Sequence, residues 1–432
     1  MRSADTAWLL VSTAFVLAMT PALGFFYGGM VRSKNALNTL MMSFAALGFV
    51  GMAWAFAGYS LAFGRSSPWI GGVEYVMLRG VGLEASGTIP HVLFFAYQGT
   101  FAIITSALIS GAIVERMRFG PYVAFITLWS VLVYAPVAHW VWGGGWLGRL
   151  GALDFAGGTV VHVNAAAAAL VCAVVVGARK DHARQAILPQ SVPLTLLGTG
   201  LLWMGWFGFN AGSALGANAA AALAFVNTML APAATLVVWT VLDLRRSGKA
   251  TAIGAATAIV VGLVAVTPAA GFVGPLAAIL LGGVAAFPSY FALLFRARTR
   301  LDDSLDVIAA HGVGGVTGAL LTGVLAQKRW NPAGADGALS GNFLQPGIQL
   351  VAIVATIAFS AGMTLAILKA ISLVSRLRAD AREEGLGLDF TQHGEEAWSR
   401  GEGAILVLDR APDDRGDTPL PVAAPAAGGG NA

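Results

Sequence analysis

The sequence predicts an all-α polytopic membrane protein, and two observations support this fold class. Apolar residues make up 57% of the 432 residues and charged residues only 11%, about half the charged share of a soluble domain. Apolar segments of about 20 residues, long enough to cross a hydrocarbon core of roughly 30 Å, recur between short polar breaks. Such long, continuous segments indicate helices rather than the short tilted strands of a membrane barrel. A soluble protein is therefore excluded.

Eleven of these segments are expected to cross the membrane. They lie near residues 7–31, 36–63, 90–113, 120–138, 157–177, 192–214, 219–242, 251–270, 275–295, 305–326 and 346–375. Sixteen Lys and Arg residues lie in the loops after odd-numbered segments and six on the other side, and basic loops stay in the cytoplasm. We therefore expect the N-terminus outside and the C-terminus inside. The first segment has neither a basic start nor a small-residue cleavage site, so no cleaved signal peptide is expected.

The composition divides the chain near residue 376. We expect residues 1–376 to form the membrane domain and residues 377–432 a cytoplasmic tail, with the Ala-, Pro- and Gly-rich end 411–432 disordered. The single cysteine, Cys172, rules out an intrachain disulfide and a Cys-rich metal site. The net charge of +4 would indicate a nucleic acid or an acidic lipid surface only if the basic residues were clustered, and no nucleic-acid partner is expected. No metal and no cofactor are expected either.

Two histidines lie well inside apolar segments, where an ionisable side chain costs at least about 2.5–3.5 kcal/mol. His162 follows Asp154 by eight residues, and His311 follows Asp303 by the same interval. Their two segments run in opposite directions, as in two inverted five-helix repeats with an eleventh helix left over, and such repeats share a site near the midplane. We expect the histidines to meet there. Separate hydrogen bonds to neighbouring helices are the alternative, and two imidazoles alone leave a metal incompletely coordinated.

Aromatic residues suggest a second site, at the outer end of the bundle. Trp206, Phe209 and Ser213 stand at i, i+3 and i+7, on one helix face. Phe101 lies in a similar segment, and Trp142 lies in an outer loop. Aromatic faces with one hydroxyl oxygen suit a small cation, which is attracted to the rings by cation–π interaction. Helix packing and an interfacial aromatic belt remain the alternatives.

Four stretches carry a resemblance to a known family. They are FYGGMVRSKN at 26–35, GALDFAGGTVVHVN at 151–164, GWFGFNAGS at 205–213 and DVIAAHG at 306–312. With them the chain resembles the ammonium transporter family over roughly residues 5–398, in the branch with eleven membrane helices and homotrimeric assembly.

The resemblance implies a role for each of the candidate residues. Phe101, Trp142 and Ser213 would form the outer recruitment site, and Phe101 with Phe209 the phenyl gate. His162 and His311 would line the pore and relay protons, with Trp206 in support. Asp154 would serve in deprotonation or in holding the structure.

The implied function is transmembrane transport of ammonium or ammonia. Moving a bare monovalent ion into a low-dielectric interior costs on the order of 20 kcal/mol, and an apolar pore offers little to offset that cost. We therefore expect recruitment of the cation outside, deprotonation, and passage of ammonia through the pore. The proton either follows through the histidines or returns outside, and the sequence leaves both routes open. An ammonium sensor that signals through its tail is the alternative function, and an enzyme is not expected.

The tail also matches the family, through Glu384 to Asp389 and through His393. Glu384, Asp389 and His393 are its candidate regulatory residues, whereas Trp398 stands where many relatives have tyrosine and residues 399–432 have no counterpart. The resemblance implies a homotrimer in lipid, in the inner membrane if the host is Gram-negative, with a role in nitrogen metabolism. It also implies a cytoplasmic P-II signal protein as a partner.

Overall fold

Helices make up nearly all of the regular structure in residues 1–398, the part of the chain that the computed structural model describes. The α-helices are α1 (Ser3–Met30), α2 (Ala36–Ala53), α3 (Tyr59–Phe63), α4 (His91–Leu108), α5 (Phe119–Trp129), α6 (Ala135–Val141), α7 (Trp146–Leu150), α8 (Asn164–Val176), α9 (Val192–Gly212), α10 (Ala219–Ser247), α11 (Ala252–Val266), α12 (Pro275–Arg296), α13 (Gly314–Leu325), α14 (Gln345–Ser372), α15 (Ala381–Leu386) and α16 (Leu388–His393). Two short strands, β1 (Ala85–Ser86) and β2 (Ile89–Pro90), pair antiparallel in the loop between α3 and α4. The predicted disorder of 411–432 lies outside the described residues.

Shorter helical turns extend or join these helices. Four of the turns are π-helical: η2 (Trp54–Gly58), η5 (Ser130–Tyr134), η6 (Gly158–Val163) and η7 (Ile308–Val313). Four are 3₁₀ turns: η1 (Ser33–Asn35), η3 (Val76–Leu78), η4 (Ile109–Ala112) and η8 (Ala338–Ser340).

Ten helical segments of residues 1–398 are long and apolar enough to cross a membrane. They are Ser3–Met30, Ser33–Phe63, His91–Ala112, Phe119–Leu150, Gly158–Val176, Val192–Gly212, Ala219–Ser247, Pro275–Arg296, Ile308–Leu325 and Gln345–Ser372. They correspond to ten of the eleven predicted segments and make the chain a multi-pass membrane protein.

The segment predicted at 251–270 contains a shorter helix. Helix α11 has 15 residues and is therefore about 22 Å long at 1.5 Å per residue. It ends at Val266, and Thr267 still has helical backbone angles. The next residue, Pro268, has no N–H to donate to the helix, so the regular hydrogen bonding stops there. The predicted segment extends to residue 270, beyond the end of this helix, because Ala269 and Ala270 after Pro268 are also apolar.

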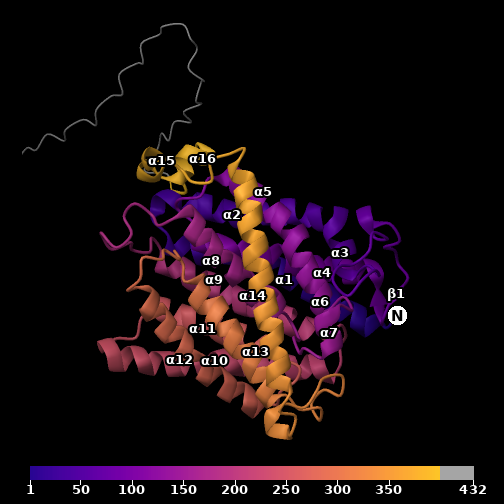
Figure 1. Ribbon diagram of the computed structural model, residues 1–432. Coiled ribbons are helices and arrows are strands. Elements are labelled where there is room, and N and C mark those ends of the chain that lie inside the picture. The colour runs from indigo at the N-terminus through magenta and orange to yellow at the C-terminus, as the bar shows by residue number, and fades with distance from the viewer. Residues whose placement is uncertain (399–432) are drawn as a thin grey trace, which may run out of the picture. The chain divides into compact units, whose positions relative to one another are not determined.

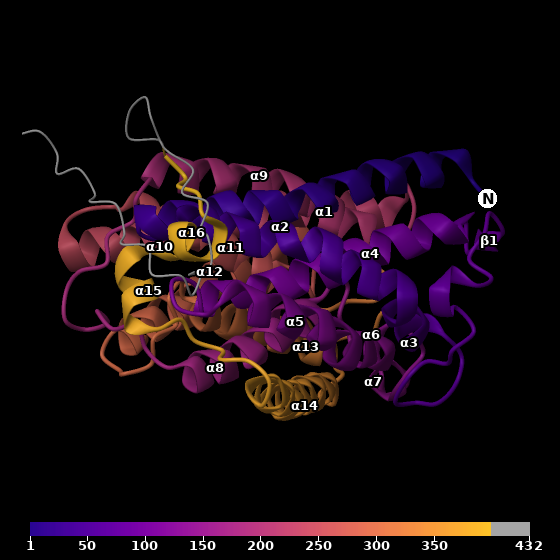
Figure 2. The same ribbon diagram turned by 90° about the horizontal axis from the view of Figure 1, so that it is seen from above.

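Long helices that are far apart in the sequence pack side by side. Helix α1 lies along α9, and α10 packs against both α11 and α12. Figure 1 shows α14 running across the face of the bundle, where it contacts α8 and α13. Figure 2 shows the start of α1 at one end of the bundle and the short helices α15 and α16 at the opposite end.

Candidate functional site

The two histidines of the repeated motif meet in the interior of the bundle. The Nδ1 atoms of His162 and His311 lie 3.1 Å apart, and their ring centroids are 5.2 Å apart at an interplanar angle of 28°. Both side chains are buried. A neutral imidazole has one donor and one acceptor nitrogen, so one ring donates to the other and a single proton lies between them.

Each histidine stands on a π-helical turn, His162 on η6 and His311 on η7. Such turns are rare in proteins, and those that occur often lie at functional sites. The wider turn changes the direction in which the following side chains point. The sequence indicated a helix at both places. Nothing in its hydrophobic period distinguished a π turn from an α turn.

Asp154 anchors the turn that carries His162. Its two carboxylate oxygens accept hydrogen bonds from the first four backbone N–H groups, those of Gly157, Gly158, Thr159 and Val160, at 2.7–3.0 Å. The first N–H groups of a helix have no acceptor within the helix itself. Here the Asp154 carboxylate supplies the missing acceptors.

Asp303 holds the equivalent position before His311, although the sequence analysis gave it no role. Its Oδ2 accepts from the N–H of Ile308 at 2.7 Å. Its Oδ1 is buried without a hydrogen-bond partner in residues 1–398. An aspartate therefore binds the start of the π-helical turn at both histidines, with more hydrogen bonds at Asp154 than at Asp303.

Two phenyl rings close the space outside the histidines. Phe101 from α4 and Phe209 from α9 stack with centroids 4.2 Å apart and planes at 24°, and both are almost completely buried. Trp142 places its ring edge-on to Phe101 at 6.0 Å. Its indole N–H donates to the carbonyl oxygen of Asp154 at 2.8 Å, which joins the outer aromatic group to the anchor of η6.

Ser213 lies just after α9, next to these rings. Its hydroxyl donates to the carbonyl oxygen of Phe209 at 2.8 Å, so the lone pairs of its oxygen stay available as acceptors. The hydroxyl of Tyr97, which the sequence analysis had not singled out, lies 3.3 Å from Ser213 Oγ and donates to the same Phe209 carbonyl. Tyr97 precedes Phe101 by four residues, and this spacing on one helix face is the signal that could have found it.

Trp206 stacks on His162, with ring centroids 5.4 Å apart and planes at 20°. Its indole N–H donates to Thr267 Oγ1 at 2.9 Å. Thr267 in turn donates to the carbonyl oxygen of Leu263 at 2.7 Å. The residue at the end of α11 thus fixes the ring that supports the histidine.

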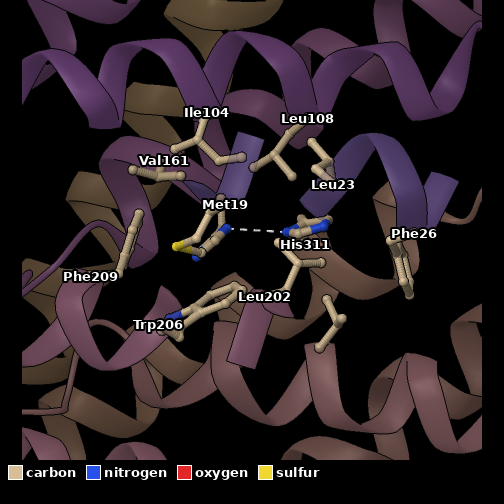
Figure 3. A pocket seen from close by; sticks show the side chains of 12 residues that line it. Met19, Leu23, Phe26, Ile104, Leu108, Val161, Leu202, Trp206, Phe209 and His311 are labelled. Atoms are coloured by element: carbon tan, nitrogen blue, oxygen red, sulfur yellow. Dashed lines mark hydrogen bonds between the residues drawn. The ribbon is translucent and has the colours of Figure 1, made fainter. Parts of the chain in front are cut away.

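A narrow cavity of about 10 Å³ runs past the histidine pair. Figure 3 shows Phe209 at one end of it, Phe26 at the other, and His311 between them. Its remaining lining is Met19, Leu23, Ile104, Leu108, Val161, His162, Leu202, Trp206 and Val260. This volume is at the lower limit for a single water molecule. The Nε2 atom of His162 is buried without a hydrogen-bond partner in the described residues, so it is free to bond a small polar molecule.

The predicted tail residues lie together at the cytoplasmic end of the predicted topology, apart from the histidine pair. Asp389 accepts from the N–H groups of Leu37 and Asn38, at 3.0 and 2.7 Å, in the first turn of α2. His393 Nε2 lies 2.9 Å from the side-chain amide nitrogen of Asn38. Glu384 pairs with Arg378. The tail helices are therefore bonded to the bundle through their own polar side chains.

A buried ion-pair network lies between the loops at the same end, and the sequence analysis did not find it. Arg179 pairs with Glu115 and with Asp302, each at 2.8 Å. Burial raises the pKa of Asp302, but the hydrogen bonds and charge of Arg179 outweigh it and lower that pKa to about 2. The three charged residues come from three different loops, and only the folded chain brings them together. Nothing in the sequence therefore indicated that they pair.

Within residues 1–398, no group of three or more His, Cys, Asp or Glu side chains is arranged to hold a metal ion.

A model of the Ammonium Transporter Family matches residues 7–398. The chain belongs to the ammonium transporter family. This is a family of transporters rather than of enzymes, and the sequence resemblance to it is confirmed.

Individual members of the ammonium transporter family match the chain over nearly its whole length. An ammonium transporter of Bacillus subtilis is 48% identical over 404 residues, which cover 92% of this chain and 99% of the relative. The crystal structure of Candida albicans Mep2 is similar with a TM-score of 0.84 at 36% identity, covering 89% of this chain and 88% of that one. A solved protein described as a sensor Amt protein has a TM-score of 0.84 at 30% identity and covers 90% of this chain and 98% of its own.

Proposed function

We propose that the protein transports ammonium across the membrane by passing ammonia through the cavity beside His162 and His311. The observation that carries the proposal is this buried histidine pair in a narrow apolar cavity behind stacked phenyl rings. An ion would lose its hydration there, at a Born cost on the order of 20 kcal/mol. The cavity lining offers only imidazole nitrogens as replacement partners. Ammonia, being neutral, avoids this cost.

The cation is first recruited at the outer end. The edge-on ring of Trp142 and the ring of Phe101 present aromatic faces, and Ser213 supplies an acceptor oxygen. Cation–π attraction is worth about 2 kcal/mol when the cation is partly desolvated. The ammonium ion then gives up one proton, and ammonia passes the rings of Phe101 and Phe209 as they separate.

The released proton follows through the histidines. The unpartnered Nε2 of His162 accepts it, and the proton between the two Nδ1 atoms shifts to His311. His311 then releases a proton from its other nitrogen toward the inner end, and ammonia is protonated again inside. One positive charge crosses for each ammonium ion, so transport is electrogenic. Return of the proton to the outside is the alternative route.

Uptake of labelled methylammonium into proteoliposomes tests the function directly. A transporter accumulates or equilibrates the label faster than empty vesicles do. Tight ammonium binding without uptake would instead favour an ammonium sensor, the function suggested by the similarity to the sensor Amt protein. We favour transport because the matching family model and the Bacillus subtilis relative are both described as ammonium transporters.

Replacing Trp142 and Ser213 together, by leucine and alanine, is expected to raise the half-saturation concentration about tenfold and to change the maximal rate much less. Recruitment precedes the barrier, so its loss removes ground-state binding and leaves the pore unchanged. Uptake measured over a range of substrate concentrations separates the two parameters. An unchanged half-saturation concentration in the double variant would show that the outer site lies elsewhere.

We propose eleven membrane crossings, with α11 as the short one, the N-terminus outside and the tail inside. The start of α1 and the tail helices at opposite ends of the bundle support an odd number (Figure 2). The membrane domain would span residues 1–376 and the tail 377–432, in a homotrimer surrounded by lipid. The membrane would be the inner one if the host is Gram-negative, and the protein would serve nitrogen metabolism.

We also propose that the tail contributes to binding a cytoplasmic P-II signal protein. Glu384, Asp389 and His393 would hold the tail in place on the bundle for this contact. Their bonds to Arg378 and to the start of α2 support an ordered tail surface. Truncation after residue 378 is expected to reduce co-purification with the host's P-II protein under nitrogen excess. Undiminished binding by the truncated protein would place the contact on the loops.

A further inference from the structure

His139 is a buried histidine near the end of α6 that has no role in the transport steps above. It is 2% exposed and precedes Trp142 by three residues. Its Nδ1 lies 2.9 Å from the carbonyl oxygen of Ala62, and its Nε2 lies 2.8 Å from the carbonyl oxygen of Ser67. Both partners are main-chain carbonyl oxygens, which accept hydrogen bonds and cannot donate them.

Two acceptor partners determine the protonation state of this ring. A neutral imidazole has one N–H and one lone pair, so one carbonyl oxygen would face a nitrogen lone pair at hydrogen-bond distance. The imidazolium donates from both nitrogens, and hydrogen bonds from a charged donor are about twice as strong as neutral ones. Burying an unpaired charge is costly, and two features offset that cost here. Both ring nitrogens donate charge-assisted hydrogen bonds, and His139 lies in the last turn of α6, where the helix dipole favours a positive charge.

The neighbouring elements supply no other partner for the ring. Four titratable side chains lie on the elements packed against α6: Tyr59 on α3, Tyr134 on η5, Arg149 on α7 and His162 on η6. The loop of residues 64–90 adds Arg65, Glu74, Tyr75, Arg79 and Glu84. None of them is a hydrogen-bond partner of His139 in residues 1–398. The two carbonyl oxygens are therefore the only hydrogen-bond partners of this ring in the described residues.

The same two carbonyl groups connect the end of α3 and the loop of residues 64–90 to the end of α6. A methyl group at Gly143 would collide with the Ala62 oxygen, so only glycine allows this close approach. The loop is also held by Trp140, whose indole N–H donates to the carbonyl oxygen of Trp69 at 2.7 Å. Gly143 N–H donates to the carbonyl oxygen of His139 at 3.1 Å. Trp142 therefore stands between His139, which lies at hydrogen-bond distance from the Ala62 oxygen, and Gly143, which has no room for a side chain beside that oxygen.

We propose that His139 is a protonated positioning residue, an imidazolium that joins the Ala62 and Ser67 carbonyl groups to the end of α6 and thereby holds Trp142 in the outer recruitment site. The positioning role rests on the proposed function of Trp142. Loss of the clamp lets the loop and the indole ring move, so recruitment weakens while the histidine pore stays intact.

Nitrogen-15 NMR of the wild-type protein, labelled at histidine and reconstituted in lipid, tests the charge without any change to the fold. We expect two protonated ring nitrogens for His139 at neutral pH, with its signals assigned by their loss in H139Q. His91 is the internal control, because its Glu84 and Tyr59 partners are satisfied by one neutral tautomer. An unprotonated nitrogen in His139 would overturn the proposal.

Methylammonium uptake tests the positioning role. His139→Phe removes both N–H donors and keeps a ring. His139→Gln keeps a single donating group, its amide NH₂, which can reach only one of the two carbonyl oxygens well. Gly143→Ala displaces the Ala62 carbonyl group. We expect the half-saturation concentration to rise roughly tenfold in His139→Phe and less in His139→Gln, with the maximal rate nearly constant. Gly143→Ala should shift it in the same direction.

Wild-type half-saturation in the variants that assemble would overturn the role, and if His139→Phe does not assemble, the other two variants and the NMR signal decide it. Failure of the proposed function is distinct from these outcomes, since the wild-type protein would then show no uptake at all.

Discussion

Replacing His162 or His311 by leucine is expected to reduce ammonium-dependent current by about 10²–10⁴-fold, the range that a positioned proton-transfer group contributes. Leucine is apolar and can neither accept the released proton nor pass it on. The loss of either ring breaks the Nδ1–Nδ1 contact of 3.1 Å, so the two single variants should behave alike. Where water enters the space left by an imidazole, potassium would begin to carry current.

Currents measured on supported membranes, first with ammonium and then with potassium, distinguish these results. His91→Gln is the matched control, because His91 bonds to Tyr59 and Glu84 in the outer part of the protein and takes no part in the pore. It should keep wild-type current and selectivity. Wild-type current with wild-type selectivity in both leucine variants would rule out the proton relay.

The sequence was sufficient to predict the helical class and the meeting of the two histidines. Apolar length determines where a chain can cross a membrane, and an ionisable residue at that depth needs a partner. The repeated interval from Asp154 to His162 and from Asp303 to His311 indicated which residues pair. Stacking of Phe101 on Phe209 followed only from the family resemblance.

Other features depend on contacts that no single segment encodes. The π turns under the histidines have the same apolar pattern as α turns, so periodicity could not reveal them. Thr267 became visible as a partner of Trp206 only when α11 was seen to end beside α9. The Arg179 network and the His139 clamp join residues from separate loops, and their hydrogen-bond partners are set by the fold.

Replacing Asp154 is expected to lower stability and transport together. Its carboxylate accepts four backbone N–H groups, and the two oxygens of a carboxylate offer about four lone-pair positions. All of them are in use, so the group cannot take a proton from ammonium without releasing part of η6. This geometry favours the structural role of Asp154 over the deprotonating one.

The alanine and asparagine variants separate the two roles of Asp154. Alanine leaves four buried donors unpaired, each costing about 1–3 kcal/mol, so a total loss of at least about 4 kcal/mol is expected. Asparagine keeps one acceptor oxygen and turns an amide NH₂ toward the remaining two donors. It should therefore also destabilise the protein, by about 2–6 kcal/mol if each of the two unpaired donors costs its usual amount.

The measurements are thermal unfolding in detergent and methylammonium uptake at matched protein density. If Asp154 is an anchor, both variants unfold at lower temperature, and uptake falls in the same order as stability, with alanine lowest. A general base would give a different pattern, because asparagine would then abolish uptake while the unfolding temperature stayed at the wild-type value. His162 moves with η6, so Asp154→Asn should also change the nitrogen-15 signals of the histidine pair, and this shift links the anchor to the pore it holds.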